Sequence, residues 1–153
     1  MNEPFNNAEV QRLFSAAPFV RELGITPTAT GRGSCETTLG VRDALTQQDG
    51  IVHAGVIAAL ADHTAGAAAA TLLTERQYLL TVEFNLSLLR AASGDRLRCV
   101  ATVLKPGRRI AVVESEVFAG NPRAERLVAK ARVTLAVSDR AANGESKIPP
   151  EAS

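Results

Sequence analysis

The sequence predicts an α+β fold in which one long apolar helix is wrapped by a curved antiparallel sheet. Two observations indicate this fold. The stretch from Ile51 to Leu73 is apolar on nearly every helical face, which is typical of a helix buried on all sides. After it, residues 79–137 change to a two-residue alternation broken by short turns, which predicts an antiparallel meander. Such a sheet covers the whole helix only by curving around it.

The chain begins with a short predicted helix. Apolar residues recur at helical spacing within residues 10–17, and Asn6 with Glu9 three residues later resembles a capping box. Pro18 is expected to end this helix. Residues 1–18 are therefore predicted to form an N-terminal helical segment.

The main predicted elements follow in order along the chain. A strand at residues 34–41 precedes the long helix, which is expected to span 54–74. In the strand after the helix, alternate residues from Leu80 to Leu88 are apolar, so we expect this face to lie on the core. The four strands of the meander are placed at residues 79–88, 95–104, 110–119 and 127–137. The folded domain is thus assigned to 19–138, and the polar residues 139–153 to a disordered tail.

Composition favours one soluble domain. The 153 residues are 46% hydrophobic and 22% charged, with a formal charge of +1. Because positive and negative charges are nearly equal in number, neither nucleic acid nor a membrane surface is expected as a general partner. Cys35 and Cys99 have no short spacing and are expected to be buried free thiols. The N-terminus lacks the pattern of a secretory signal, so we expect a cytoplasmic protein.

Asp62 is the most informative residue, because it lies within the apolar helix. Burying an ionised carboxylate without partners costs several kcal/mol, so Asp62 needs either a partner, such as a hidden arginine, or a catalytic role. Backbone N–H groups in the first turn, near Ala54, lack intrahelical partners and can polarise a carbonyl. Eight residues of helix separate the two positions by roughly 12 Å. Two antiparallel helices across a two-fold axis would bring them together, which predicts a dimer.

A family resemblance rests on these same residues. The Gly-x-x-His-x-Gly stretch from Gly50 to Gly55, followed by Asp62, and the order of elements over residues 20–138 resemble the hot-dog fold thioesterases. More specifically, the chain resembles the phenylacetate-degradation (PaaI-like) type of acyl-CoA thioesterase, within the 4-hydroxybenzoyl-CoA thioesterase superfamily. The implied reaction is hydrolysis of an acyl-CoA to a free acid and coenzyme A.

The resemblance implies a role for each matching position. Asp62 either attacks the thioester carbonyl or activates water, and the backbone N–H of Ala54 polarises that carbonyl. Gln47 lies beside the thioester in the partner subunit, and the Thr81 hydroxyl orients the reacting water. His53 secures the turn. The usual His-Gly-Gly of the family has Ala54 in its middle here, and the donor N–H survives this change.

Further residues are expected to contact the substrate. His53 and Gly55 belong to the signature, and three arginines are expected near the phosphates of coenzyme A, namely Arg90, Arg108 and Arg109. No metal-ligand spacing, phosphate loop or Ser-His-Asp signature is found, so no metal or cofactor is expected beyond the coenzyme A of the substrate.

Two other functions stay open at this point. The first is an enoyl-thioester hydratase or dehydratase of the same fold, although the pattern that such enzymes resemble has histidine as the catalytic base. The second is a non-catalytic acyl-CoA-binding module. The favoured interpretation is a thioesterase that forms a homodimer or a dimer of dimers, a homotetramer.

Overall fold

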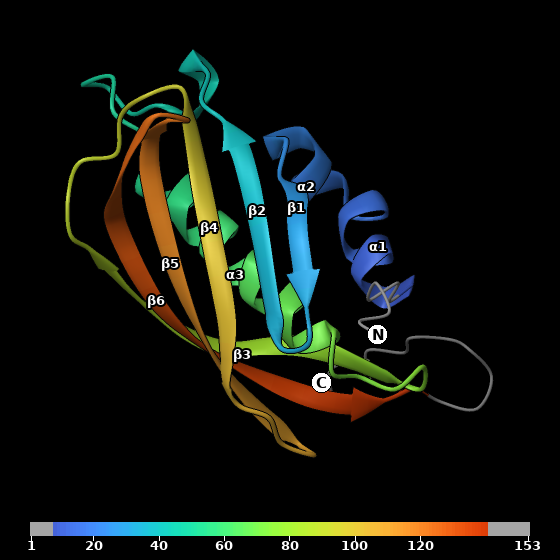
Figure 1. Ribbon diagram of the computed structural model, residues 1–153. Helices are drawn as coiled ribbons and strands as arrows, with labels where there is room; N and C mark the ends of the chain where they lie inside the picture. Colours follow the sequence, from blue (N-terminus) through green and yellow to red (C-terminus); the bar gives the residue numbers. More distant parts are fainter. Residues whose placement is uncertain (1–7, 141–153) are drawn as a thin grey trace, which may run out of the picture.

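The computed structural model describes residues 8–140 and contains one curved sheet with a long helix against its concave face (Figure 1). Over these residues the chain forms three α-helices, one 3-10 turn and six strands. In order these are α1 (Ala8–Ser15), α2 (Pro18–Leu23), β1 (Thr26–Gly31), β2 (Ser34–Gly40), η1 (Asp43–Leu45), α3 (Ala54–Ala70), β3 (Gln77–Leu88), β4 (Arg96–Lys105), β5 (Ile110–Asn121) and β6 (Ala124–Asp139).

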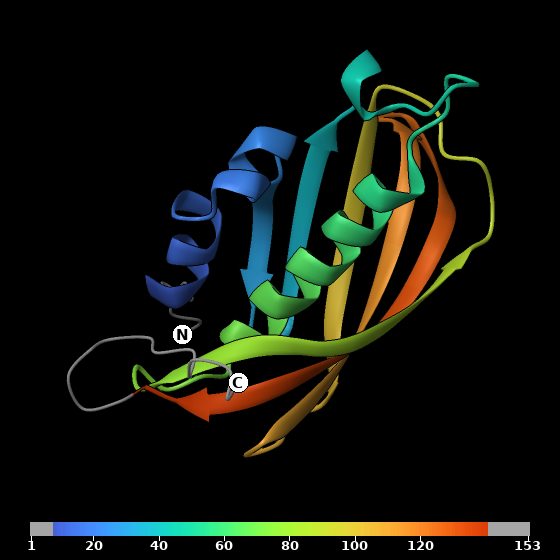
Figure 2. The same cartoon turned by 180° about the vertical axis from the view of Figure 1, so that it is seen from behind.

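The six strands are antiparallel in the order β1-β2-β4-β5-β6-β3. Although β3 is the next element after α3, its only partner among the described strands is β6, so it forms one edge of this sheet. Seen from behind in Figure 2, α3 lies across the strands, while α1 and α2 lie beside β1. The predicted fold, a long helix wrapped by a curved antiparallel sheet, is confirmed.

Small side chains allow α3 to lie close to the sheet. Ala61, Ala65 and Ala68 are fully buried, and the strands place larger side chains against them, including Leu97 and Val113. Further fully buried residues on the strands are Leu39, Val117, Val133 and Leu135. Within residues 8–140 no helix combines the length and apolarity needed to cross a membrane.

The long helix ends four residues earlier than the sequence pattern predicts. Its last residue is Ala70, and the hydroxyl of Thr71 donates to the Ala68 carbonyl while accepting from the backbone N–H of Gly33. This hydroxyl ties the helix end to the turn between β1 and β2. The chain then turns toward β3 instead of continuing the helix.

In the N-terminal part, one expectation is corrected and one strand is found that was not predicted. Pro18 does not only end the first helix but also begins α2, since proline is well suited to the first turn of a helix. Strand β1 was not predicted, because its sequence TPTATG is polar and five of its six residues are exposed. The proposed cap residue Asn6 lies outside the described residues.

The expectation for the apolar face of β3 is wrong. Leu80, Val82, Phe84 and Leu88 are between 42% and 61% exposed, and of the predicted face only Leu86 packs, partly buried, against the core of its own chain. A register shift between Thr81 and Glu83 also interrupts the alternation at this point.

The end of the folded region lies slightly beyond the expected boundary. Strand β6 continues through Asp139, and the backbone N–H of Arg140 donates to the carbonyl of Arg76. The remaining part of the predicted tail, residues 141–153, lies outside the described residues.

Candidate active site

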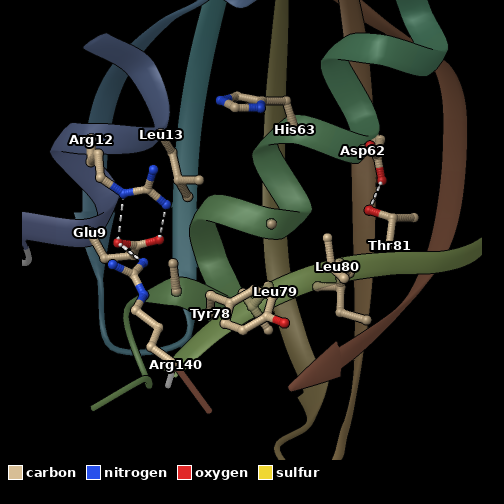
Figure 3. A pocket seen from close by; sticks show the side chains of 13 residues that line it. Glu9, Arg12, Leu13, Asp62, His63, Tyr78, Leu79, Leu80, Thr81 and Arg140 are labelled. Carbon is tan, nitrogen blue, oxygen red and sulfur yellow. Dashed lines mark hydrogen bonds and ion pairs between the residues drawn. The ribbon is translucent and has the colours of Figure 1, made fainter. Parts of the chain in front are cut away.

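Asp62 lies in the middle of α3 with its side chain directed toward β3 (Figure 3). The Thr81 hydroxyl donates a hydrogen bond of 2.9 Å to Asp62 Oδ1. The carboxylate is half-buried, and no cation forms an ion pair with it within residues 8–140. Desolvation raises the pKa of Asp62, and the hydrogen bond from Thr81 opposes that shift.

The carboxylate opens onto a cavity of about 500 Å³ between α1, α3 and β3. Asp62 and Thr81 lie at one end, and the middle is lined mostly by apolar side chains (Figure 3). The lining residues are Glu9, Arg12, Leu13, Asp62, His63, Gly66, Ala70, Tyr78, Leu79, Leu80, Thr81, Leu135 and Arg140. Such a mixed, partly open cavity beside a half-buried carboxylate is typical of a binding site.

The first turn of α3 leaves one backbone donor available. His53 is the N-cap, and its Nδ1 accepts from the N–H of Gly55 at 2.9 Å. The carbonyl of His53 accepts from the N–H groups of Val56 and Ile57. For the N–H of the exposed Ala54, no acceptor is found in the described part of the chain. This donor lies at the positive end of the helix dipole.

Alanine fits at position 54 without backbone strain. No non-glycine residue between residues 8 and 140 has a positive φ, so Ala54 does not require the left-handed conformation that glycine favours. Position 55 is tighter, because a Cβ there would lie 3.0 Å from Nδ1 of His53. The departure from His-Gly-Gly therefore falls at the position that tolerates a methyl group.

Gln47 lies in the loop that leads into α3. Its backbone N–H donates to the carbonyl of Ile51, and its side-chain oxygen accepts from the N–H of Asp49. Gln47 thus lies in the loop before α3 and Ala54 is the first residue of the helix, while Asp62 is eight residues after Ala54, at roughly 12 Å from it. One chain presents two separated halves of the predicted site.

His63, which follows Asp62, points away from the carboxylate (Figure 3). Its ring packs edge-on against Phe14, with 4.9 Å between the ring centroids. Burial lowers the pKa of His63, which favours the neutral ring. It is therefore not placed to pair with Asp62.

The three predicted arginines are not brought together in one chain. The backbone N–H of Arg90 donates to the carbonyl of Val128, and the carbonyl of Arg109 accepts from the N–H of Val137. Nine residues of β6 separate these two points by about 30 Å. Arg108 and Arg109 lie exposed in the turn between β4 and β5.

Sequence reasoning missed the charged residues at the other end of the cavity. Glu9 and Arg12 of α1 meet Arg140 there, and Glu9 is 131 residues from Arg140 in the chain. No local motif could have indicated that contact. Among the described residues there is no group of three or more potential metal ligands.

The known proteins to which this chain is similar agree with one another in their family. The family model described as Thioesterase superfamily matches residues 49–126, which include Ala54, Asp62 and Thr81. The structure of a thioesterase family protein from Silicibacter pomeroyi is 34% identical and has a TM-score of 0.83, over 86% of this chain and 96% of that chain. A thioesterase structure from Haemophilus influenzae is 26% identical and has a TM-score of 0.80, over 94% of this chain and 97% of that chain.

A curated relative agrees with these structures. A protein of Sulfurisphaera tokodaii with the provisional name of an esterase is 30% identical over 114 residues, which are 74% of this chain and 84% of the relative.

Proposed function

This chain belongs to the Thioesterase superfamily and is a thioester hydrolase, and from that premise we propose that it hydrolyses acyl-CoA thioesters to a free acid and coenzyme A. We assign it to the phenylacetate-degradation type. The proposed enzyme works in the cytoplasm as a homodimer or a dimer of dimers, with Asp62 as the reacting carboxylate.

The observation that carries this proposal is the environment of Asp62. A half-buried carboxylate with no ion-pair partner in residues 8–140 is costly to the fold, and here it faces a cavity of about 500 Å³. Thr81 supplies this carboxylate with one hydrogen bond but with no compensating charge. A carboxylate that is kept unpaired beside a cavity is suited to react with a ligand in that cavity.

A single carboxylate and one polarising dipole suffice for thioester chemistry, because the thiolate leaves without strong acid help. In the general-base route, Asp62 takes a proton from water as the water oxygen bonds to the thioester carbon. The carbon–sulfur bond then breaks, and the departing thiolate takes the proton from Asp62. In the nucleophilic route, a carboxylate oxygen of Asp62 bonds to that carbon and displaces the thiolate, and water then hydrolyses the anhydride. Thr81 holds the carboxylate in both routes.

The proposal requires two chains, because Asp62 is roughly 12 Å from the Ala54 donor of its own helix. The exposed apolar residues on the edge strand β3 support pairing with a second copy. In such a pair, Asp62 of one chain would face the Ala54 N–H and the Gln47 side chain of its partner. The oxyanion would form at that N–H.

Coenzyme A would extend from this site to exposed arginines. Arg90, Arg108 and Arg109 are the proposed cations for its phosphates. About 30 Å of β6 separates Arg90 from Arg108 and Arg109. We therefore expect one coenzyme A molecule to contact either Arg90 or the Arg108–Arg109 pair of a given chain, but not both.

Substitution of Asp62 by asparagine tests the proposal. Asp62→Asn keeps the shape and can keep the contact with Thr81, but removes the base, so thiol release from acyl-CoA should fall about 10³-fold. The matched control is Asp95→Asn, which changes an exposed carboxyl group and should leave the rate unchanged.

Other outcomes would contradict the proposal. Near-full activity of Asp62→Asn would remove Asp62 from the mechanism. With the wild-type protein, water addition to an enoyl thioester without thiol release would indicate a hydratase. Saturable binding of acyl-CoA with no turnover would indicate a binding module.

A further inference from the structure

The cavity beside Asp62 has two ends of different chemistry (Figure 3). Asp62, Gly66 and Ala70 are spaced by four residues and form one stripe of α3 along it, with a length of about 12 Å. On the opposite wall β3 extends from Thr81 to Tyr78 over about 10 Å. The reacting carboxylate is at one end of both walls, and a charged cluster is at the other.

The charged cluster consists of Glu9, Arg12 and Arg140. Arg12 binds Glu9 through two nitrogens, at 3.0 and 2.7 Å, and Arg140 Nη2 binds Glu9 Oε2 at 2.8 Å. The hydrogen bond from Arg12 lowers the pKa of Glu9, so its carboxyl group is ionised. Among these three side chains two guanidinium groups therefore share one carboxylate, so the charged cluster itself carries a net charge of +1.

The cluster is also incompletely hydrogen-bonded. Arg140 Nε is buried and has no hydrogen-bond partner within residues 8–140, although the Arg140 side chain lines the cavity. Buried polar atoms are normally paired, so an orphan donor beside a cavity points to a ligand or a rearranged contact. The Tyr78 side chain lines the same end of the cavity.

We propose that this cavity binds aliphatic acyl groups that end in a carboxylate, so that the preferred substrates are CoA monothioesters of medium-length dicarboxylic acids. The proposal rests on the proposed thioesterase function and names its substrate class. The thioester carbonyl would lie at Asp62, and the far carboxylate would join Glu9 between Arg12 and Arg140.

Charge and shape favour this class over fatty acyl groups of the same length. The middle of the cavity is lined by Leu13, Leu79 and Leu80, which suit a methylene chain. A methyl end would cover a cluster with excess positive charge without compensating it, whereas a carboxylate neutralises the excess and accepts charge-assisted hydrogen bonds. At about 1.3 Å per chain bond, the cavity length corresponds to about six to ten carbons.

Matched pairs of substrates test the proposal. Thiol release is measured with CoA thioesters of about six, eight and ten carbons, each ending either in methyl or in carboxylate. For at least one length, the wild-type kcat/KM should be about tenfold higher or more for the carboxylate-ended member. Equal or lower kcat/KM for that member at every length would overturn the proposal.

Two variants that break the same ion pair should shift this preference in opposite directions. Arg140→Met removes a cation, so the ratio of kcat/KM for carboxylate-ended over methyl-ended substrate should fall about tenfold. Glu9→Gln removes the competing carboxylate, so the same ratio should rise. If the cluster only supports the fold, both variants would change the two substrates alike, which would overturn the proposal.

The matched control is Arg123→Met, in the exposed turn between β5 and β6, which should leave the ratio unchanged. The design separates the two levels of inference. Absence of thiol release from every pair would contradict the thioesterase proposal itself, and the substrate class with it. Asp62-dependent release with a preference for methyl ends would contradict the substrate class alone.

Discussion

Two opposing effects set the basicity of Asp62. Partial burial in α3 raises the pKa of its carboxyl group, and the hydrogen bond from Thr81 lowers it. A higher pKa makes the carboxylate a stronger base, while the hydrogen bond helps to keep it ionised near neutral pH. Thr81 is therefore expected to control both the position and the protonation of Asp62.

Replacing Thr81 should move the pH dependence of the reaction. Because the ionised form of Asp62 reacts, kcat/KM should fall as the pH falls through the raised pKa of this carboxyl group. The acid limb of the pH profile of kcat/KM should therefore lie above 3.8, the ordinary pKa of an aspartate. Thr81→Val removes the hydrogen bond that lowers this pKa, so the limb should move to higher pH. The control Thr102→Val, at an exposed position of β4, should not move it. A shift to lower pH with Thr81→Val would contradict this assignment.

At the scale of residues, the candidate site residues that the sequence indicated are those that interrupt or end a local pattern. Asp62 stands out because it interrupts an apolar helix, and Ala54 because it follows a turn motif at the helix start. The Glu9–Arg140 contact could not be predicted, since it joins residues 131 positions apart, one on α1 and one just after β6. Long-range ion pairs leave no periodic signal in a sequence.

Helix α3 combines close packing with open space at Gly66. A Cβ at this position would meet no heavy atom within 4 Å, and the residue lines the cavity. Gly66→Ala should therefore stabilise the protein by about 0.5–1 kcal/mol through helix propensity. The added methyl group should narrow the cavity and lower kcat/KM several-fold for acyl groups that fill it. Urea unfolding at fixed protein concentration and thiol-release kinetics measure the two effects, and a loss of stability would contradict the observed space.

Strand β3 shows what periodicity can and cannot predict. The alternation from Leu80 to Leu88 correctly indicated a strand with an apolar face, but not what covers that face. Periodicity reports that side chains avoid water, and a second chain can satisfy that requirement as well as the chain's own core. Strand β1 illustrates the opposite case, because a polar, exposed strand leaves no apolar alternation to detect.

A charge on the apolar face of β3 should separate the proposed dimer. Phe84→Lys places a cation on the exposed edge strand, and we expect monomers and a loss of thiol release of at least about 100-fold. The control is Leu104→Lys, on the β4 side of the β4–β5 turn, where the wild-type leucine is similarly exposed at 52%. Light scattering and kinetics report the two properties. A fully active monomer would contradict the two-chain site.

At the scale of the whole molecule, the fold separates the two halves of the site. Asp62 and Thr81 meet at the middle of α3, while Ala54 begins the helix roughly 12 Å away and Gln47 lies in the loop before it. Because α3 is a rigid, buried helix, no local movement brings these halves together within one chain. Two chains related by a two-fold axis would form two equivalent sites.

Complementation between two inactive chains tests this arrangement most directly. Asp62→Asn removes the carboxylate, and Ala54→Pro removes the backbone donor while keeping the helix, because position 54 is the first helical residue and His53 before it is extended, with φ −63° and ψ 137°. Heterodimers that carry one chain of each kind are isolated with two different tags. If the site is shared, each homodimer should be inactive, whereas each heterodimer should have one intact site and about half of the wild-type rate. Heterodimers as inactive as both parents would contradict a site shared between chains.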